Sequence, residues 1–384
     1  MSTSYITRLT PFLIFLSLLL AFSSGFFLHS HLTEQSYPLV EEAHSILKKQ
    51  SLYEIAPQIN LEHGMIKGML QTFEDPFTTF IEPIQTELTS DNLRGHYGGI
   101  GVDLGRDGNG NWVLYPFPGK PAAVAGIQEA DHLLEVDGIE IFPETTLDTI
   151  QAAIRGPINE TVMIKVLRIP ELSPLEFTII REEIQLPSLT WHAAAADPQV
   201  GVIKVNLIAA STPDEMLDAV SDLKLRGVSH FILDLRNNGG GMLEAGIDTA
   251  SLFLNQGVIM QQEYKQQEIE TFRVNQPGPL VDIPLVVLVN RATASAAEII
   301  AGALKAHERA YLIGEPTYGK TTIQLIFSLS DGSSMHLTSG RWWIPDLFPP
   351  LEQTGVQPDM NFESDHQSPE AMIEAAILYL LKSG

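Results

Sequence analysis

The strongest constraint on the fold is a short apolar run that leads to one serine. Residues 284–290 read Pro-Leu-Val-Val-Leu-Val-Asn, a β-branched stretch typical of a strand buried on both faces of a sheet. Residues 296–305 follow with apolar side chains at helical spacing. Ser295 therefore lies at a predicted strand-to-helix turn. Its hydroxyl can project there from the sheet edge, and the N–H of Ala296, unpaired in the first helical turn, can point toward a developing oxyanion.

Lys320 is the candidate base for this serine, because a serine hydroxyl is a poor nucleophile alone. The lysine must be neutral near pH 7, which requires burial and no paired carboxylate. Its neighbours in sequence are largely apolar or amphipathic, and Gln324 could hold the amine by a hydrogen bond without charging it. Two simpler interpretations stay open: Ser295 as a helix cap only, and Lys320 as a solvated or salt-bridged surface residue.

The segment around Lys320 also fits a nucleotide-binding motif. Residues 314–321, Gly-Glu-Pro-Thr-Tyr-Gly-Lys-Thr, satisfy the Walker A phosphate-loop pattern. That pattern needs a helix after it, because the helix N-terminus and the loop amides bind the phosphates. Residues 321–329 are instead β-branched and apolar, and they stop at Asp331-Gly332, a hairpin turn signal. The sequence thus predicts a strand after Lys320 and disfavours a P-loop NTPase.

A third segment, residues 230–242, is a predicted buried strand that runs into three successive glycines. Successive glycines let backbone amides approach a ligand closely. Gly240 or Gly241 could therefore supply a second oxyanion donor.

These segments together resemble the C-terminal processing peptidases, also called tail-specific proteases. The resemblance is carried by residues 234–241, 289–299 and 314–324, and it extends to 74–80, 97–102 and 354–359. It implies a mixed α/β core of the ClpP/crotonase type, with no cofactor and no metal. It also implies Ser295 as nucleophile, Lys320 as general base, Gln324 as the residue that orients the lysine, and amides near Gly240 and Ala296 as the oxyanion hole. Members often have a small residue at the position of Arg291, which could narrow the approach to Ser295.

Residues 97 to about 170 predict a small β-rich domain that resembles a PDZ domain. In such domains an extended peptide adds to a sheet edge, and glycine-turn amides receive its terminal carboxylate. The resemblance implies Gly99, Ile100 and Gly101 as that turn, with Val102 and Leu104 beside the groove. The alternative is that these glycines serve turn geometry only.

The N-terminus carries an uncharged apolar run, residues 11–28, preceded by Arg8. It predicts an uncleaved membrane anchor, or a cleaved signal segment, with the catalytic part outside the cytoplasm, in the periplasm or at the cell exterior. The expected domains are an anchor or signal segment, a helical region, a PDZ domain and a protease core. Their expected bounds are 1–30, 31–95, 96–175 and 176–384.

Composition excludes several function classes. A net charge of -24 argues against nucleic acid, because phosphate binding needs clustered Lys and Arg. The absence of cysteine excludes disulfides, thiolate metal sites and a Cys nucleophile. The histidines lack metal-ligand spacing. We therefore expect a serine endopeptidase that acts on proteins with free C-termini, with a homo-oligomer left open. The alternative is a catalytically inactive PDZ-containing scaffold that binds peptides.

Overall fold

The computed structural model describes residues 37–170, 173–362 and 369–383, and the apolar run 11–28 lies outside them. Within the described ranges, no helix has the length and apolar character needed to cross a membrane. The chain divides between Met65 and Ile66 into two compact units. The first contains helix α2 (Pro38–Gln50), and helix α3 (Gln58–Gln71) spans the division. Both helices agree with the predicted N-terminal helical region.

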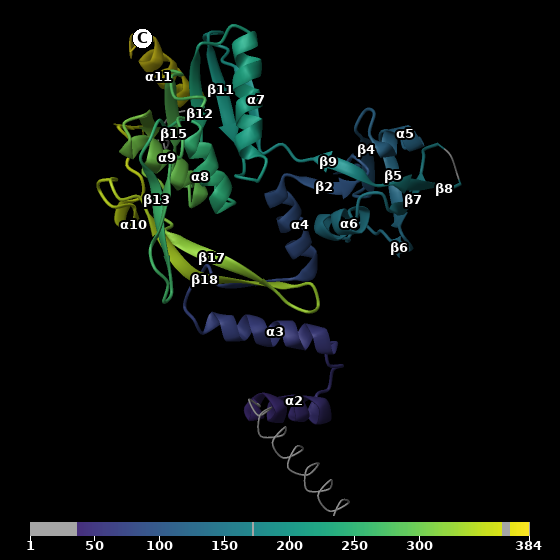
Figure 1. The fold of residues 1–384 in the computed structure, drawn as a ribbon. Coiled ribbons are helices and arrows are strands. Elements are labelled where there is room, and N and C mark those ends of the chain that lie inside the picture. The colour runs from purple at the N-terminus through teal and green to yellow at the C-terminus, as the bar shows by residue number, and fades with distance from the viewer. Residues whose placement is uncertain (1–36, 171–172, 363–368, 384) are drawn as a thin grey trace, which may run out of the picture. The chain divides into compact units, whose positions relative to one another are not determined.

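A six-stranded sheet belongs to the second unit (Figure 1). Its order is β10-β11-β12-β15-β16-β19, parallel from β11 onward, with β10 antiparallel at one edge. The strand bounds are Leu189–Ala193 (β10), Val200–Val205 (β11), His230–Asp234 (β12), Leu285–Val289 (β15), Tyr311–Gly314 (β16) and Met360–Asn361 (β19). The predicted strand at 284–290 is therefore a central strand of this sheet.

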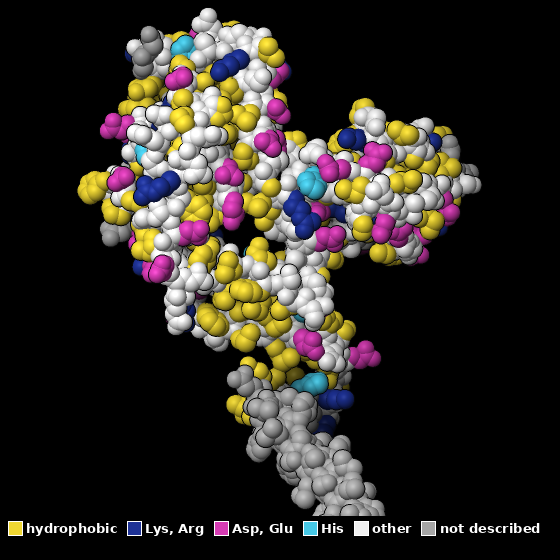
Figure 2. Space-filling view, viewed as in Figure 1, with side chains coloured by type: hydrophobic (Ala, Val, Ile, Leu, Met, Phe, Trp, Pro, Cys, Tyr) yellow, Lys and Arg dark blue, Asp and Glu magenta, His cyan; other side chains and the backbone are white. Residues whose placement is uncertain are grey.

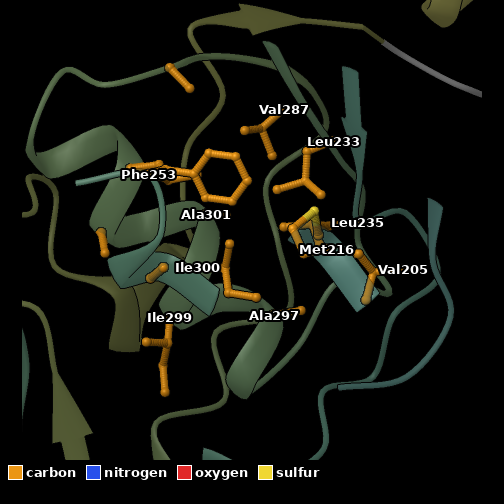
Figure 3. Close-up of a cluster of buried hydrophobic side chains, with 14 of the residues drawn as sticks. Val205, Met216, Leu233, Leu235, Phe253, Val287, Ala297, Ile299, Ile300 and Ala301 are labelled. Carbon is orange, nitrogen blue, oxygen red and sulfur yellow. The ribbon is translucent and has the colours of Figure 1, made fainter. Parts of the chain in front are cut away.

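Helices cover both faces of this sheet, which explains the continuous apolar run of β15. Val287 and Val289 face the cluster formed with α7, α8 and α9 (Figure 3), whereas Val286 and Leu288 face α11. All five residues of β15 are buried. The alternation follows from the two-residue period of a strand. The helix bounds are Thr212–Leu225 (α7), Leu243–Ser251 (α8), Ala296–Ala306 (α9) and Pro369–Ser383 (α11).

A second sheet carries the strand that follows Lys320. Its order is β1-β18-β13-β14, and β17 pairs with β18 as well. Its strands are β1 (Thr79–Ile81), β13 (Val258–Tyr264), β14 (Glu270–Arg273), β17 (Thr322–Ser328) and β18 (Ser334–Trp343), and the short helix α10 (Leu351–Thr354) follows. β17 and β18 form a hairpin whose turn contains Gly332 at φ 86°. A strand stands where a P-loop requires a helix, so the Walker A interpretation is wrong.

The PDZ-like region has a core of its own. Its sheet runs β3-β4-β5-β7-β8, with β6 beside β5, and its buried apolar side chains form a separate cluster. A short helix, α5, ends at Gly126 in the left-handed conformation. The bounds are Val102–Arg106 (β3), Trp112–Pro116 (β4), Pro121–Ala125 (α5), Asp131–Val136 (β5), Ile139–Glu140 (β6), Leu147–Ile154 (α6), Thr161–Leu167 (β7) and Leu175–Ile180 (β8).

A helix and a two-stranded ribbon flank the PDZ-like region. Helix α4 (Pro83–Arg94) precedes it, and β2 (His96–Gly99) pairs with β9 (Glu182–Gln185). The chain thus enters and leaves the region through adjacent strands. The mixed α/β fold with an inserted β-rich domain is confirmed.

Candidate active site

Ser295 occupies a strained backbone position between β15 and α9. Its φ of 57° and ψ of -124° are unusual for a residue with a side chain. The loop before it is fixed to the neighbouring strand end, because Ala294 N–H donates to the carbonyl of Asn238 at 2.9 Å and Thr293 Oγ1 donates to the carbonyl of Leu235 at 2.9 Å. Such strain persists where the surrounding structure holds it and is common at functional turns.

Ser295, Lys320 and Gln324 line one cleft of about 570 Å³. The three residues come from the turn before α9, from the loop before β17 and from β17 itself. Apolar and polar side chains line the rest of the cleft, and the apolar or aromatic ones are Leu93, Met242, Leu243, Tyr264, Ile323, Leu325, Ile326 and Trp342. The structure thus brings the predicted nucleophile and base to one hollow.

The Lys320 side chain is half-buried. Its Nζ lies 4.5 Å from the centroid of the Phe77 ring. Burial lowers the pKa of Lys320 below its ordinary value, against opposing effects of the Asp75 and Glu298 carboxyl groups. None of the ion pairs found among the described residues involves Lys320. These surroundings favour the neutral amine over a solvated or salt-bridged lysine.

Sequence reasoning missed three neighbours of Lys320. Phe77 and Asp75 lie in the stretch 74–80, which carried the family resemblance without a role. Burial alone would raise the pKa of Asp75, but hydrogen bonds from Thr338 and Thr78 hold it below its ordinary value. The pKa of His336 is lowered by burial and then by the charge of Lys320. His336 had no signal in the sequence, because its position depends on the pairing of β18 with β17.

Glu298 ties the serine turn to the lysine loop. Its side chain is fully buried, and its Oε2 accepts N–H bonds from Ser295 at 2.8 Å and from Lys320 at 2.9 Å. Its Oε1 accepts from the Gly319 N–H at 2.6 Å and from Thr317 Oγ1. Burial raises the pKa of Glu298, although these hydrogen bonds oppose the shift. Glu298 stood within the family segment 289–299, but its role requires the fold.

Gln324 lies on the cleft but is not bonded to the lysine. Its Nε2 donates to Thr322 Oγ1 at 3.0 Å and to Thr338 Oγ1 at 3.2 Å. Both Gln324 and Lys320 are described, and none of the hydrogen bonds found for either residue joins their side chains. Its predicted role in orienting the amine stays a prediction.

The glycine cluster approaches the serine, but one predicted oxyanion donor is already engaged. Gly240 donates its N–H to Asn238 Oδ1 at 2.8 Å, so this amide does not face the cleft, and that assignment is corrected. A Cβ at Gly240 would lie 2.9 Å from Ser295 Cβ, so only glycine fits there. Ile208 N–H donates to the carbonyl of Gly240, and Met242 N–H donates to the carbonyl of Ile208. The N–H of Gly241 therefore points away from Ile208, and Gly241 lines the cleft. Gly241 and Ala296 are thus the candidate donors.

Arg291, considered from the sequence, and His307 both lie away from the reacting groups. Arg291 Nε pairs with Glu315 Oε1 at 3.1 Å, and Arg291 is not among the cleft-lining residues, so it does not narrow the approach to Ser295. His307 Nε2 lies 2.8 Å from the carbonyl of Val258, at the far end of α9.

A second, smaller hollow of about 40 Å³ lies between β3 and α6. It is lined by Tyr97, Ile100, Gly101, Val102, Asp103, Leu104, Gln151, Ile154 and Arg155. Because β3 is an edge strand of its sheet, the hollow borders an open backbone edge. Four of the five predicted peptide-binding residues line it. Gly99 does not, because it belongs to β2 and pairs with Glu182.

Comparison with known proteins identifies the family. A model of peptidase family S41 matches residues 199–362, and a PDZ domain model matches residues 112–168. A carboxyl-terminal-processing protease of Synechocystis sp. is 36% identical over 329 residues, covering 83% of this chain and 76% of that protein. The protein of that name from Picosynechococcus sp. is 36% identical over 295 residues, covering 76% and 70%. The chain belongs to peptidase family S41.

This S41 peptidase is thus a serine peptidase, a hydrolase, and it carries a PDZ domain. The S41 match spans Ser295, Lys320 and Gln324, whereas the PDZ match begins after the residues predicted to bind peptide. The solved structure of a photosystem II D1 C-terminal processing protease is also similar, with 27% identity and a TM-score of 0.45 over 85% of this chain and 88% of that one.

Proposed function

We propose that this S41 peptidase is an endopeptidase that cleaves proteins near their C-termini with Ser295 as nucleophile and Lys320 as general base. The observation that carries the proposal is their shared cleft, in which burial lowers the pKa of Lys320. A lysine of lowered pKa can accept the serine proton without a histidine.

The proposed reaction follows from this arrangement. Ser295 Oγ attacks the peptide carbonyl carbon, and neutral Lys320 takes the hydroxyl proton. The N–H groups of Ala296 and Gly241 stabilise the oxyanion. Lys320 then gives the proton to the leaving amine nitrogen as the C–N bond breaks. Neutral Lys320 next takes a proton from a water whose oxygen attacks the acyl carbon. The bond from that carbon to Ser295 Oγ then breaks, Lys320 returns the proton to Oγ, and the new carboxyl terminus is released.

The PDZ domain is proposed to bind the substrate's C-terminal tail in the hollow between β3 and α6. The open edge of β3 supports this assignment, because an extended peptide can add to it. We also propose that the catalytic part acts outside the cytoplasm, with residues 1–30 as anchor or cleaved signal. The uncharged run 11–28 supports this. The domain bounds given from the sequence stay predictions.

The test compares the full-length protein with Ser295→Ala and Lys320→Ala on an unfolded protein that ends in apolar residues, with fragments followed by mass spectrometry. Each variant is expected to lose at least about 10³-fold in cleavage rate. Ser221→Ala and Lys224→Ala, both exposed on α7, are matched controls and should cleave normally. Tail binding without cleavage by the wild type would favour the inactive scaffold. Cleavage that survives in both variants would refute the dyad.

A further inference from the structure

β17 is an edge strand that begins beside the proposed catalytic residues. It pairs with β18 on one side, and β18 uses its other side to pair with β1 and β13. In the part of the chain that the structure describes, no further strand pairs with β17. Lys320 precedes its first residue by two positions. An open row of backbone N–H and C=O groups therefore leads away from the catalytic lysine.

The cleft runs along this open edge. Six of the seven residues of β17 line it, namely Thr322, Ile323, Gln324, Leu325, Ile326 and Ser328. Successive side chains of a strand point to opposite faces of the sheet. A hollow confined to one face would meet only alternate residues of β17. This hollow meets Ser334 and His336 of β18 on one face of the hairpin, and because it also meets neighbouring residues of both kinds on β17, it extends to the edge of that strand. The opposite wall is α4, through Thr86, Thr89, Ser90, Leu93 and Arg94.

The edge lacks the usual protection against strand addition. Residues 323–327 read Ile-Gln-Leu-Ile-Phe, without charge or proline. Leu325, Ile326 and Phe327 are 39%, 52% and 45% exposed. Hydrophobic side chains gather on the surface over this hairpin (Figure 2). Proteins normally blunt such an edge with charges, prolines or a covering element, because it is a template for pairing with another chain.

We infer that β17 receives the substrate as an added β-strand, so that an extended, unfolded peptide lies between β17 and α4 with its scissile bond at Ser295. The inference rests on the proposed function and specifies how that site holds its substrate. At about 3.3 Å per residue, β17 can pair with about six or seven substrate residues. Because the lysine lies at the start of β17, the paired residues lie on one side of the scissile bond. A folded substrate segment has no free backbone to offer and is excluded.

Backbone substitution in a substrate tests this pairing without altering the enzyme. A peptide with one cleavage site is made in versions that replace one backbone N–H at a time by an ester oxygen. On one side of the scissile bond, every second replacement should lower kcat/KM about 3- to 10-fold, and those between should have little effect. Replacements without this alternation, or equal effects on both sides, would overturn the inference.

Thiol crosslinking locates the strand. The chain contains no cysteine, so an introduced one is unique. Ile326→Cys in a Ser295→Ala background should form a disulfide with peptides carrying cysteine at alternate positions of the paired side. Leu225→Cys, 86% exposed on α7, is the control and should show no positional preference. A disulfide-linked pair of enzyme chains that excludes the peptide would mean that β17 pairs with a second copy, and would overturn the assignment.

A small fluorophosphonate that acylates serine separates this inference from the proposed function. It needs no strand partner, so it should label Ser295 whichever way the peptide binds. If Ser295 is labelled and the peptide is cleaved, but the ester replacements show no alternating effect on kcat/KM, strand addition is refuted and the proposed function stands. Neither labelling nor cleavage of the unmodified peptide refutes the proposed function itself.

Discussion

Replacing Glu298 by glutamine should weaken both stability and catalysis, because four donors converge on its carboxyl group. Ser295 N–H and Lys320 N–H reach Oε2, and Gly319 N–H and Thr317 Oγ1 reach Oε1. A glutamine offers one oxygen in place of two. In the better of its two orientations the oxygen keeps Ser295 and Lys320, and the Thr317 hydroxyl can turn to accept from the new NH₂. The Gly319 N–H then faces the NH₂ group of the glutamine, which is also a donor, and loses its acceptor.

The magnitude follows from this count. A buried N–H without an acceptor costs about 1–3 kcal/mol, and replacing bonds to a carboxylate by bonds to an amide costs about 1 kcal/mol more. Glu298→Gln should therefore lose about 2–4 kcal/mol of stability, or roughly 4–16 °C in Tm. Glu298→Ala leaves all four donors without their acceptor and should not fold stably.

Thermal unfolding and fluorophosphonate labelling of Ser295 measure the two effects of Glu298→Gln. Labelling should slow together with peptide cleavage, because the Ser295 turn and the Lys320 loop lose their common acceptor. Glu374→Gln, exposed on α11, is the matched control and should leave both unchanged. A Glu298→Gln variant with wild-type Tm and wild-type labelling would refute the idea that this carboxyl group holds the two loops together.

Three further predictions concern the serine and the lysine. With Lys320 as base, kcat/KM should rise with pH as its ammonium loses a proton, with a midpoint below the ordinary lysine pKa of 10.5; a midpoint at or above that pH would argue against Lys320. Lys320→Met should raise Tm at pH 7, because burial lowers the folded-state pKa. The unfolded chain binds the lysine proton more tightly than the folded chain does, so the stability of the wild type rises with pH up to the ordinary lysine pKa. The difference in Tm between Lys320→Met and the wild type should therefore shrink as the pH approaches that value. Gly240→Ala should cost about 2–4 kcal/mol and slow labelling of Ser295, since its Cβ would lie 2.9 Å from Ser295 Cβ at a φ of 101°; unchanged Tm in a denaturation series would contradict this.

Local sequence predicted the elements well where one pattern had a single physical solution. Within the run 284–290, residues 285–289 had no polar side chain to expose, and they became a central strand covered on both faces. The β-branched residues after Lys320 outweighed the Walker A letters, and they formed β17. In both cases the apolar period, rather than a motif, predicted the structure.

The contacts between segments could not be predicted in this way. Phe77 approaches Lys320 from the turn before β1, far away in sequence, and His336 does so from β18, the hairpin partner of β17. No local period marks either residue. The N–H of Gly240 was assigned to the oxyanion hole because glycine permits close approach. Its φ of 101° instead directs this amide to Asn238 and leaves Gly241 at the cleft. Composition fixes where a backbone can bend, but only the three-dimensional partners fix where its amides point.

Glu298 also explains how a strained serine and a buried lysine can be kept in one place. A non-glycine residue at the φ of Ser295 costs about 1–3 kcal/mol, and half-burying an amine adds a further cost. The Glu298 carboxyl group accepts both the Ser295 N–H and the Lys320 N–H at the same oxygen. This one side chain therefore offsets both costs. Because the two loops share that oxygen, neither can relax without weakening the bond to the other. Nucleophile and base are therefore positioned together through their backbones.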